Sequence, residues 1–155
     1  MDWQMKIALA CDHAALELKK ELMGLLDGMG MAYEDFGTYE AVSCNYPIYG
    51  ERAARAVARG DCDRGILICG TGVGMSLVAN KVKGIRCVVC SEPYSAQMSR
   101  LHNNANVLAM GARVVGTDLA KMIARIWLET PFEGGRHQKR IDMIAAIENG
   151  ETPRE

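Results

Sequence analysis

The sequence lacks an excess of charge of either sign. Its 155 residues include 18 lysines and arginines against 19 aspartates and glutamates, which gives a formal net charge of −1. Because nucleic-acid binding requires a strongly basic surface, this balance argues against a nucleic-acid partner. Internal repeats, low-complexity segments and acidic or basic tails are also missing. The composition, with nearly half of the residues apolar, therefore predicts one compact globular domain.

Long apolar runs are missing as well. No segment approaches the roughly 18 apolar residues of a membrane span. The N-terminal stretch MDWQMKIALA has neither the charged start nor the long apolar core of a secretory signal. We therefore expect a cytoplasmic protein without membrane contact, in which the six cysteines are reduced thiols. Cys87 and Cys90 have the C-x-x-C spacing, but in a strand they would point to opposite faces, so no shared metal or redox bridge is expected.

The most informative stretch that is present runs from Arg64 to Lys81. Gly65 to Ile68 is a short apolar run without polar alternation, typical of a strand buried on both faces of a parallel sheet. Cys69 follows, and then Gly70 to Gly74 places three glycines in five residues. Such a backbone turns tightly and can direct several N–H groups at an anion. The pattern predicts a helix from Ser76 to Lys81.

Strand-like and helix-like segments alternate along the whole chain. Five strand–helix units with short connections imply a single parallel sheet with helices on both faces. The expected fold is a Rossmann-like three-layer αβα sandwich with a five-stranded sheet, formed by one domain (1–150) and followed by a frayed tail (151–155). The expected strands are 5–10, 31–36, 65–68, 85–90 and 106–110, and the expected helices are 14–26, 47–59, 76–81, 91–101, 117–129 and 141–147.

Three polar side chains follow expected strands. Cys69 could serve as a base or nucleophile, because the loop N–H groups and the next helix favour a negatively charged sulfur; the alternative is a buried structural thiol. Asp12 and His13 end the first strand, and the carboxyl ends of parallel strands share one edge, so both belong on the side of Cys69. Asp12 could instead cap the following helix.

Other candidates lie further along the chain. His102 and Asn103 follow a helix, where a helix C-cap is the simpler interpretation. Arg113, Arg136 and Arg140 could clamp a phosphate, although lone arginines are usually solvated. Histidines and carboxylates do not cluster in the sequence at the spacing of metal ligands, so no metal is expected.

The glycine loop leaves a nucleotide-binding alternative open. Gly70, Gly72 and Gly74 form G-x-G-x-G rather than the dinucleotide motif G-x-G-x-x-G, and there is no Walker lysine. Glu92, near the end of the next strand, could still take the place of the ribose-binding acid.

The motifs in their order and spacing closely resemble the ribose-5-phosphate isomerase B family, within the group that also contains galactose-6-phosphate isomerase subunits. The matching segments cover nearly the whole chain: Cys11-Asp12-His13, Tyr46-Pro47, Ile66 to Gly74, Asn80-Lys81, Cys90 to Ala96, His102-Asn103, Asn106-Val107, Gly111 to Arg113, and Gly134 to His137 with Arg140. One departure is Asn45, where family members commonly carry an aspartate, which leaves the pH profile open.

The resemblance implies reversible interconversion of ribose 5-phosphate and ribulose 5-phosphate, without metal or nucleotide cofactor. It suggests Cys69 as the proton-transferring base, assisted by Asp12 and Thr71, with His102 in ring opening. It places His13, Arg113, Arg136 and Arg140 at the phosphate. Further substrate contacts are implied at Tyr46, Gly70, Gly72, Gly74 and Asn103.

Two functional alternatives remain. One is an isomerase of a 6-phosphohexose such as allose or galactose 6-phosphate. The other is a non-catalytic module that binds a sugar phosphate or nucleotide, which would have no use for Cys69. A helix of ten residues would carry His102 roughly 15 Å from the edge where Cys69 lies. If His102 acts in ring opening, as the resemblance implies, it must reach the Cys69 of a neighbouring chain. We therefore expect a homodimer or higher homo-oligomer with active sites shared between subunits.

Overall fold

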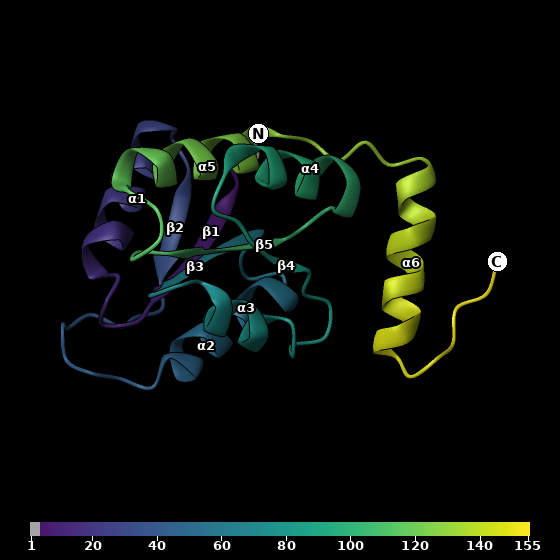
Figure 1. Ribbon diagram of the computed structural model, residues 1–155, viewed down its shortest axis with the longest axis horizontal. Helices are drawn as coiled ribbons and strands as arrows, with labels where there is room; N and C mark the ends of the chain where they lie inside the picture. Colours follow the sequence, from purple (N-terminus) through teal and green to yellow (C-terminus); the bar gives the residue numbers. More distant parts are fainter. Residues whose placement is uncertain (1–3) are drawn as a thin grey trace.

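The chain folds around one parallel sheet (Figure 1). The structure is a computed structural model that describes residues 4–155, so residues 1–3 of the expected domain lie outside the described residues. Its five strands lie in the order β2-β1-β3-β5-β4, and all neighbours are parallel. The predicted three-layer α/β fold is confirmed. The strands are β1 (Lys6–Cys11), β2 (Ala32–Asp35), β3 (Arg64–Cys69), β4 (Cys87–Val89) and β5 (Val107–Gly111).

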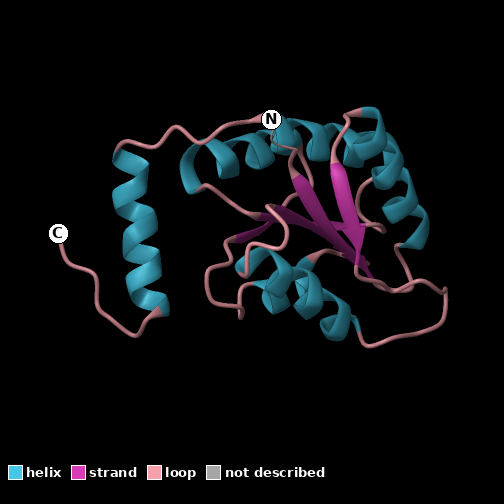
Figure 2. Ribbon diagram, turned by 180° about the vertical axis from the view of Figure 1, so that it is seen from behind, coloured by secondary structure: helices cyan, strands magenta, loops and turns pink. Residues whose placement is uncertain are grey.

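Helices cover both faces of this sheet, as Figure 2 shows from behind. They are α1 (Leu16–Gly28), α2 (Tyr46–Ala58), α3 (Val73–Ala79), α4 (Pro93–Asn103), α5 (Thr117–Glu129) and α6 (Arg136–Glu148). Within residues 4–155, none of them combines the length and the apolar character that a membrane span needs. Residues 151–155 form neither helix nor strand.

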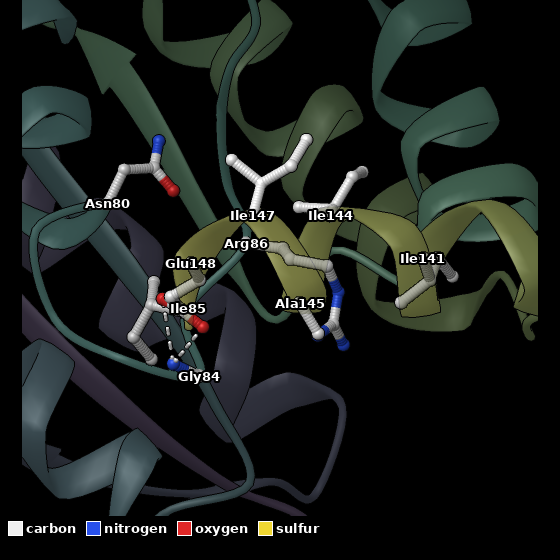
Figure 3. A pocket seen from close by; sticks show the side chains of 9 residues that line it. All are labelled: Asn80, Gly84, Ile85, Arg86, Ile141, Ile144, Ala145, Ile147 and Glu148. Carbon is white, nitrogen blue, oxygen red and sulfur yellow. Dashed lines mark hydrogen bonds between the residues drawn. The ribbon is translucent and has the colours of Figure 1, made fainter. Parts of the chain in front are cut away.

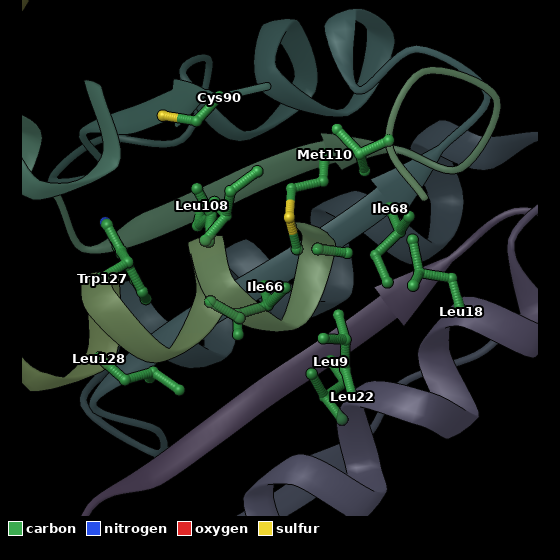
Figure 4. Close-up of a cluster of buried hydrophobic side chains, with 14 of the residues drawn as sticks. Leu9, Leu18, Leu22, Ile66, Ile68, Cys90, Leu108, Met110, Trp127 and Leu128 are labelled. Atoms are coloured by element: carbon green, nitrogen blue, oxygen red, sulfur yellow. The ribbon is translucent and has the colours of Figure 1, made fainter. Parts of the chain in front are cut away.

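The apolar run of β3 is explained by two separate cores. Ile66 and Ile68 pack into a core shared with α1, α4 and α5, drawn in Figure 4. Leu67 and Cys69 point to the other face and pack into a core shared with α2 and α3. Since both faces of the strand are buried, there is no polar alternation along it. The same geometry fixes the direction of Cys69, which faces α2 and α3.

The sheet changes its direction of winding between β1 and β3. These two strands are neighbours, yet α1 after β1 covers one face and α3 after β3 covers the other. In open α/β sheets such a switch point leaves a crevice outside the carboxyl ends of the two strands, where ligands bind. Asp12 and Cys69 lie at these two ends.

Two helices begin earlier than the sequence predicts. α3 starts at Val73 rather than Ser76, because Gly72 has a left-handed backbone (φ 83°) and turns the chain into the helix. α6 starts at Arg136 rather than Ile141, after two glycines with positive φ. The first turns of α6 are polar and, apart from His137, exposed, so they carry no apolar periodicity by which they could be recognised.

Helix α6 lies beside α4 and apart from the sheet, so we refer to it as the α6 arm (Figures 1 and 2). Ile141 is buried, but Ile144 and Ile147 remain 49% and 61% exposed. Near its end, the carboxylate of Glu148 accepts a hydrogen bond from the Gly84 amide at 3.2 Å. The arm therefore has an apolar face that this chain covers only in part.

Candidate active site

A hollow of about 410 Å³ opens at the switch point of the sheet. Its lining combines groups from the ends of β1, β3 and β5 with the glycine loop and the starts of α2 and α3. Except for Val73 and Leu77, the residues that line it are predicted site residues. The lining consists of Asp12, Tyr46, Cys69, Gly70, Thr71, Val73, Gly74, Leu77 and Arg113.

Cys69 lines the hollow. It is the last residue of β3 and only 5% exposed. The backbone N–H of Gly72 donates a hydrogen bond to its Sγ at 3.1 Å. A sulfur held in this way, in the lining of an open hollow, is placed to meet a bound molecule while the rest of the residue stays packed in the core.

The loop after Cys69 is shorter than predicted, because Gly74 already belongs to α3. The amide of Val73 donates to Thr71 Oγ1 at 3.2 Å, and that of Gly72 is used by the sulfur. Within residues 4–155, the amides of Gly70, Thr71 and Gly74 donate to no other atom of the chain. These three N–H groups remain available to an oxyanion.

Asp12 is directed into the hollow rather than used as a helix cap. Its Oδ1 accepts a hydrogen bond from the Ala14 amide at 2.9 Å, and the N-cap of α1 is Ala15. The alternative that Asp12 caps the helix is therefore wrong. The residue is 8% exposed and lines the hollow.

His13, the next residue, does not line the hollow but contacts the loop before α2. Its Nδ1 accepts a hydrogen bond from the Cys44 amide at 3.4 Å and lies 3.8 Å from Cys44 Sγ. In the neutral ring with Nδ1 as acceptor, Nε2 carries the proton and can donate to an anion. This contact cannot be predicted from the sequence, because the two residues are 31 positions apart and no local pattern joins them.

Arg113 lies over the glycine loop at the rim of the hollow. Its backbone N–H donates to Gly70 O at 3.0 Å, and its Nη1 would be 3.3 Å from a Cβ at Gly70. The side chain is exposed, and no carboxylate within residues 4–155 forms a salt bridge with it. Its guanidinium is therefore available for a phosphate.

The structure does not bring His102 and Asn103 to this hollow. α4 starts near the carboxyl edge of the sheet and is about 16 Å long. At its far end, the carbonyls of Asn103 and Asn104 accept hydrogen bonds from Arg86, which precedes β4. His102 thus lies towards the opposite edge from Cys69 of the same chain. The C-cap itself is Asn104, with a left-handed backbone (φ 46°).

Arg136 and Arg140 are also distant from Cys69 along the fold. They lie on the α6 arm, where they line a separate hollow of about 170 Å³ with Lys139, Met143 and Glu155. A single chain therefore divides the predicted site residues into two groups. One group surrounds Cys69, and the other gathers at the end of α4 and on the α6 arm.

A further hollow lies between the α6 arm and the body and has a volume of about 340 Å³ (Figure 3). It is largely apolar, with Ile85 and Ile144 among its lining. Its two charged groups are already bonded: Glu148 to the Gly84 amide and Arg86 to carbonyls at the end of α4. Its one carboxylate, that of Glu148, is thus already engaged, and the lining includes no thiol, hydroxyl or imidazole, so this hollow is not the candidate active site.

The structure also bears on two features of the sequence, the possible ribose-binding acid Glu92 and the C-x-x-C spacing of Cys87 and Cys90. Glu92 accepts a hydrogen bond from the Ser95 amide at 3.0 Å as the N-cap of α4, a contact that lowers the pKa of its carboxyl. This gives Glu92 a structural role, which weakens the nucleotide-binding alternative. Cys87 and Cys90 belong to the cores on opposite faces of the sheet, as expected for residues three apart in a strand.

The fold brings together two histidines and a carboxylate that are not neighbours in the sequence. His102, Glu133 and His137 offer ligand atoms that all lie within 4.8 Å of one another. They come from α4, the segment before α6, and α6, so only the fold brings them together.

Comparison with known proteins identifies the family. The family model described as Ribose/Galactose Isomerase matches residues 7–144. The chain belongs to this family, as its motifs suggested. It is 57% identical over 143 residues to ribose-5-phosphate isomerase B of Escherichia coli K12, covering 92% of this chain and 96% of the relative.

Two further relatives add to this result. The structure of ribose-5-phosphate isomerase B from Clostridium thermocellum superimposes with a TM-score of 0.92 at 51% identity, covering 94% of this chain and 99% of that one. A D-erythrulose-4-phosphate isomerase from Pectobacterium atrosepticum is 44% identical over 150 residues, with 95% of this chain and 97% of that protein covered. The family thus includes members named for sugar phosphates of different length.

Proposed function

We propose that the protein interconverts D-ribose 5-phosphate and D-ribulose 5-phosphate by proton transfer through an enediolate, with Cys69 as the base. The observation that carries this proposal is the position of Cys69 in the lining of the switch-point hollow, next to loop amides that donate to no other atom of residues 4–155. The 57% identity to a ribose-5-phosphate isomerase B supports the choice of substrate.

The reaction needs only a base and a pocket for a negatively charged oxygen. The thiolate of Cys69 removes the proton from C2 of the open-chain aldose, and the C2–H electrons form the C1–C2 double bond while O1 becomes negative. The amides of Gly70, Thr71 and Gly74 stabilise this oxyanion. Asp12 and the Thr71 hydroxyl pass the O2 proton to O1, and the Cys69 thiol returns its proton to C1. Atoms and charge balance without a metal or a redox cofactor.

Phosphate binding would orient the sugar over Cys69. Arg113 and His13 follow β5 and β1, so they lie at the same carboxyl edge of the sheet as the sulfur. The Arg113 guanidinium and the His13 ring can donate hydrogen bonds to an anion. Binding a phosphate far from the reacting carbons fixes the sugar and so accelerates proton transfer.

We further propose that a second copy of the chain completes the site. His102, Asn103, Arg136 and Arg140 would then serve the Cys69 hollow of the partner subunit. The length of α4, which separates His102 from the sheet edge that holds Cys69, supports this proposal. The arginines of the α6 arm are exposed, and one chain leaves the apolar face at Ile144 and Ile147 half covered. A symmetric dimer would have two equivalent sites of this kind. The unpaired cysteines fit the cytoplasmic location expected from the sequence.

A direct assay tests the proposal. Purified protein is given ribose 5-phosphate, allose 6-phosphate, galactose 6-phosphate or D-erythrulose 4-phosphate, and formation of the isomer is measured for each. We expect the highest kcat/KM with ribose 5-phosphate. A higher value for a hexose phosphate would favour the 6-phosphohexose alternative, and one for the four-carbon sugar would favour the activity named for the Pectobacterium relative. Binding without turnover of any of them would favour the non-catalytic module.

A further inference from the structure

Outside the switch-point hollow, two histidines and a carboxylate form a compact cluster where the α6 arm meets α4. The rings of His102 and His137 stack with their centroids 4.3 Å apart and their planes 16° apart. His137 Nε2 lies 3.2 Å from Glu133 Oε2. All three side chains offer a ligand atom within 4.8 Å of the others.

The backbone around this cluster is well fixed. The Glu133 amide donates to Leu101 O at 3.1 Å, which joins the segment before α6 to the last turn of α4. The His137 amide donates to Gly134 O at 3.2 Å in the turn that opens α6. His137 is buried, His102 is partly buried and Glu133 is exposed, so a cation can reach the cluster from solvent.

We propose that His102, Glu133 and His137 bind one Zn²⁺ or a similar transition-metal ion. Two imidazoles and one carboxylate suit Zn²⁺, and water would fill the fourth position of an open tetrahedral site. Bonds of about 2.0–2.1 Å place tetrahedral ligand atoms roughly 3.3 Å apart. The cluster must therefore contract, and one of the nearly parallel rings must turn. His102, at the end of its helix and partly exposed, has the freedom to do so.

The bound ion would act as an inhibitor rather than a cofactor. It would occupy the ring of His102 and tie α4 to the α6 arm, which carries Arg136 and Arg140. This consequence rests on the proposed function, because it requires His102 to act on the substrate. Metal binding itself does not depend on that role.

A second place in the chain could also attract Zn²⁺. Cys44 Sγ lies 3.8 Å from His13 Nδ1, and thiolate and imidazole are both zinc ligands. A test must therefore separate nitrogen and oxygen ligands from sulfur. Three variants do so: Glu133→Gln and His137→Gln alter the proposed site, and Cys44→Ser alters the competing one.

The binding experiment uses the full chain without an affinity tag, fully reduced and freed of metal. Zn²⁺ affinity is measured by calorimetry, and the ligand type by the absorption spectrum with Co²⁺. We expect one ion per chain at this site and no thiolate-to-cobalt charge-transfer band. Affinity should fall at least about tenfold in Glu133→Gln and His137→Gln, since even the loss of a group that only supports a ligand costs 10–100-fold. Cys44→Ser and the carboxylate control Glu129→Gln should bind as the unaltered chain does.

Two results would overturn the site: unchanged affinity in both Glu133→Gln and His137→Gln, or a charge-transfer band that disappears in Cys44→Ser. An activity assay then tests the inhibitory consequence. Zn²⁺ should inhibit isomerisation, and Glu133→Gln should need at least about ten times more Zn²⁺ for the same fractional loss of its own activity. If Zn²⁺ binds as expected but does not inhibit, the metal site stands and the proposed role of His102 fails.

Discussion

The ring of Tyr46 lies directly against the backbone of Gly74, and a Cβ at Gly74 would come within 2.6 Å of the Tyr46 Cζ. No side chain can occupy this position unless the tyrosine moves. Because Tyr46 lines the switch-point hollow, the glycine at position 74 determines the shape of the wall that faces the substrate.

Replacing Gly74 by alanine should therefore reduce activity without unfolding the protein. Alanine is favoured over glycine in a helix by roughly 1 kcal/mol, so α3 itself would gain stability while Tyr46 is displaced. We expect kcat/KM for ribose 5-phosphate to fall at least about tenfold, the size of effect that misplacement by about 1 Å can produce. The matched control is Gly24→Ala, on the exposed side of α1 where a Cβ meets nothing within 4 Å. If the Gly74 variant is as active as this control, Tyr46 does not shape the site.

Replacing Cys69 by alanine should abolish turnover while the chain still folds. Loss of a general base usually costs about two to four orders of magnitude in rate. The matched control is Cys62→Ala, a buried thiol in the same core that does not line the hollow. Activity, the thermal midpoint and binding of a sugar phosphate are measured for both variants. Near-normal turnover by Cys69→Ala would remove it as the base.

Thiol alkylation at pH 8 should distinguish Cys69, which lines the switch-point hollow, from Cys11, Cys87 and Cys90, which do not. Burial raises the pKa of Cys11 and Cys90 to about 11 and that of Cys87 to about 12. Since a thiol with a raised pKa stays protonated below that value, these three have almost no thiolate at pH 8 and should remain unlabelled in the folded protein. Mass spectrometry of peptides should show Cys69 labelled, and ribose 5-phosphate should slow that labelling. Equal labelling of Cys69 with and without sugar phosphate would argue against substrate in this hollow.

Removal of divalent metal should leave the isomerase active. The proposed chemistry uses only the sulfur, loop amides and neighbouring side chains, so no step requires a Lewis acid. The experiment is dialysis against a strong chelator followed by assay in metal-free buffer. Activity that disappears and returns with one particular divalent ion would show that a metal takes part in the reaction.

Much of this could be predicted from the sequence, because the informative patterns are local. The apolar run of β3 requires burial on both faces, and the glycines after Cys69 require a tight turn, so the sheet and the hollow follow from short segments. The parallel arrangement then places Asp12 at the same edge as Cys69, although the two are far apart in the chain. This inference needs only the general rule that the carboxyl ends of parallel strands meet at one edge of the sheet.

The features that were missed depend on contacts between distant segments. Nothing near Cys44 indicates that its amide binds His13, and nothing near Glu133 indicates that His102 and His137 lie beside it. The early start of α6 was missed for a different reason. Its first turns are polar, and helices on such segments are recognised by their glycine boundaries rather than by periodicity.

Sharing of the active site between subunits can be tested by mixing two inactive variants. Cys69 lies at the carboxyl edge of the sheet, where α4 starts, and His102 lies near the other end of this helix. Since α4 is about 16 Å long, we expect the two side chains of one chain to be too far apart to act on one substrate. Cys69→Ala and His102→Ala proteins should each be inactive. When they are mixed and allowed to exchange subunits, a mixed dimer contains one site with neither native group and one site with both.

Random exchange of equal amounts makes half of the dimers mixed, and each of these has one of its two sites restored. The mixture should therefore recover up to about a quarter of the unaltered activity. Exchange is followed separately, for example by native mass spectrometry of the mixed species. The control pairs Cys69→Ala with Gly74→Ala, whose altered residues line the same hollow of one chain. In that mixed dimer each site carries one of the two defects, so the mixture should gain nothing beyond the residual activity of its parents. The shared-site proposal is wrong if exchange is complete and the first mixture stays inactive, or if the protein is active as a monomer, because His102 would then have no route to Cys69.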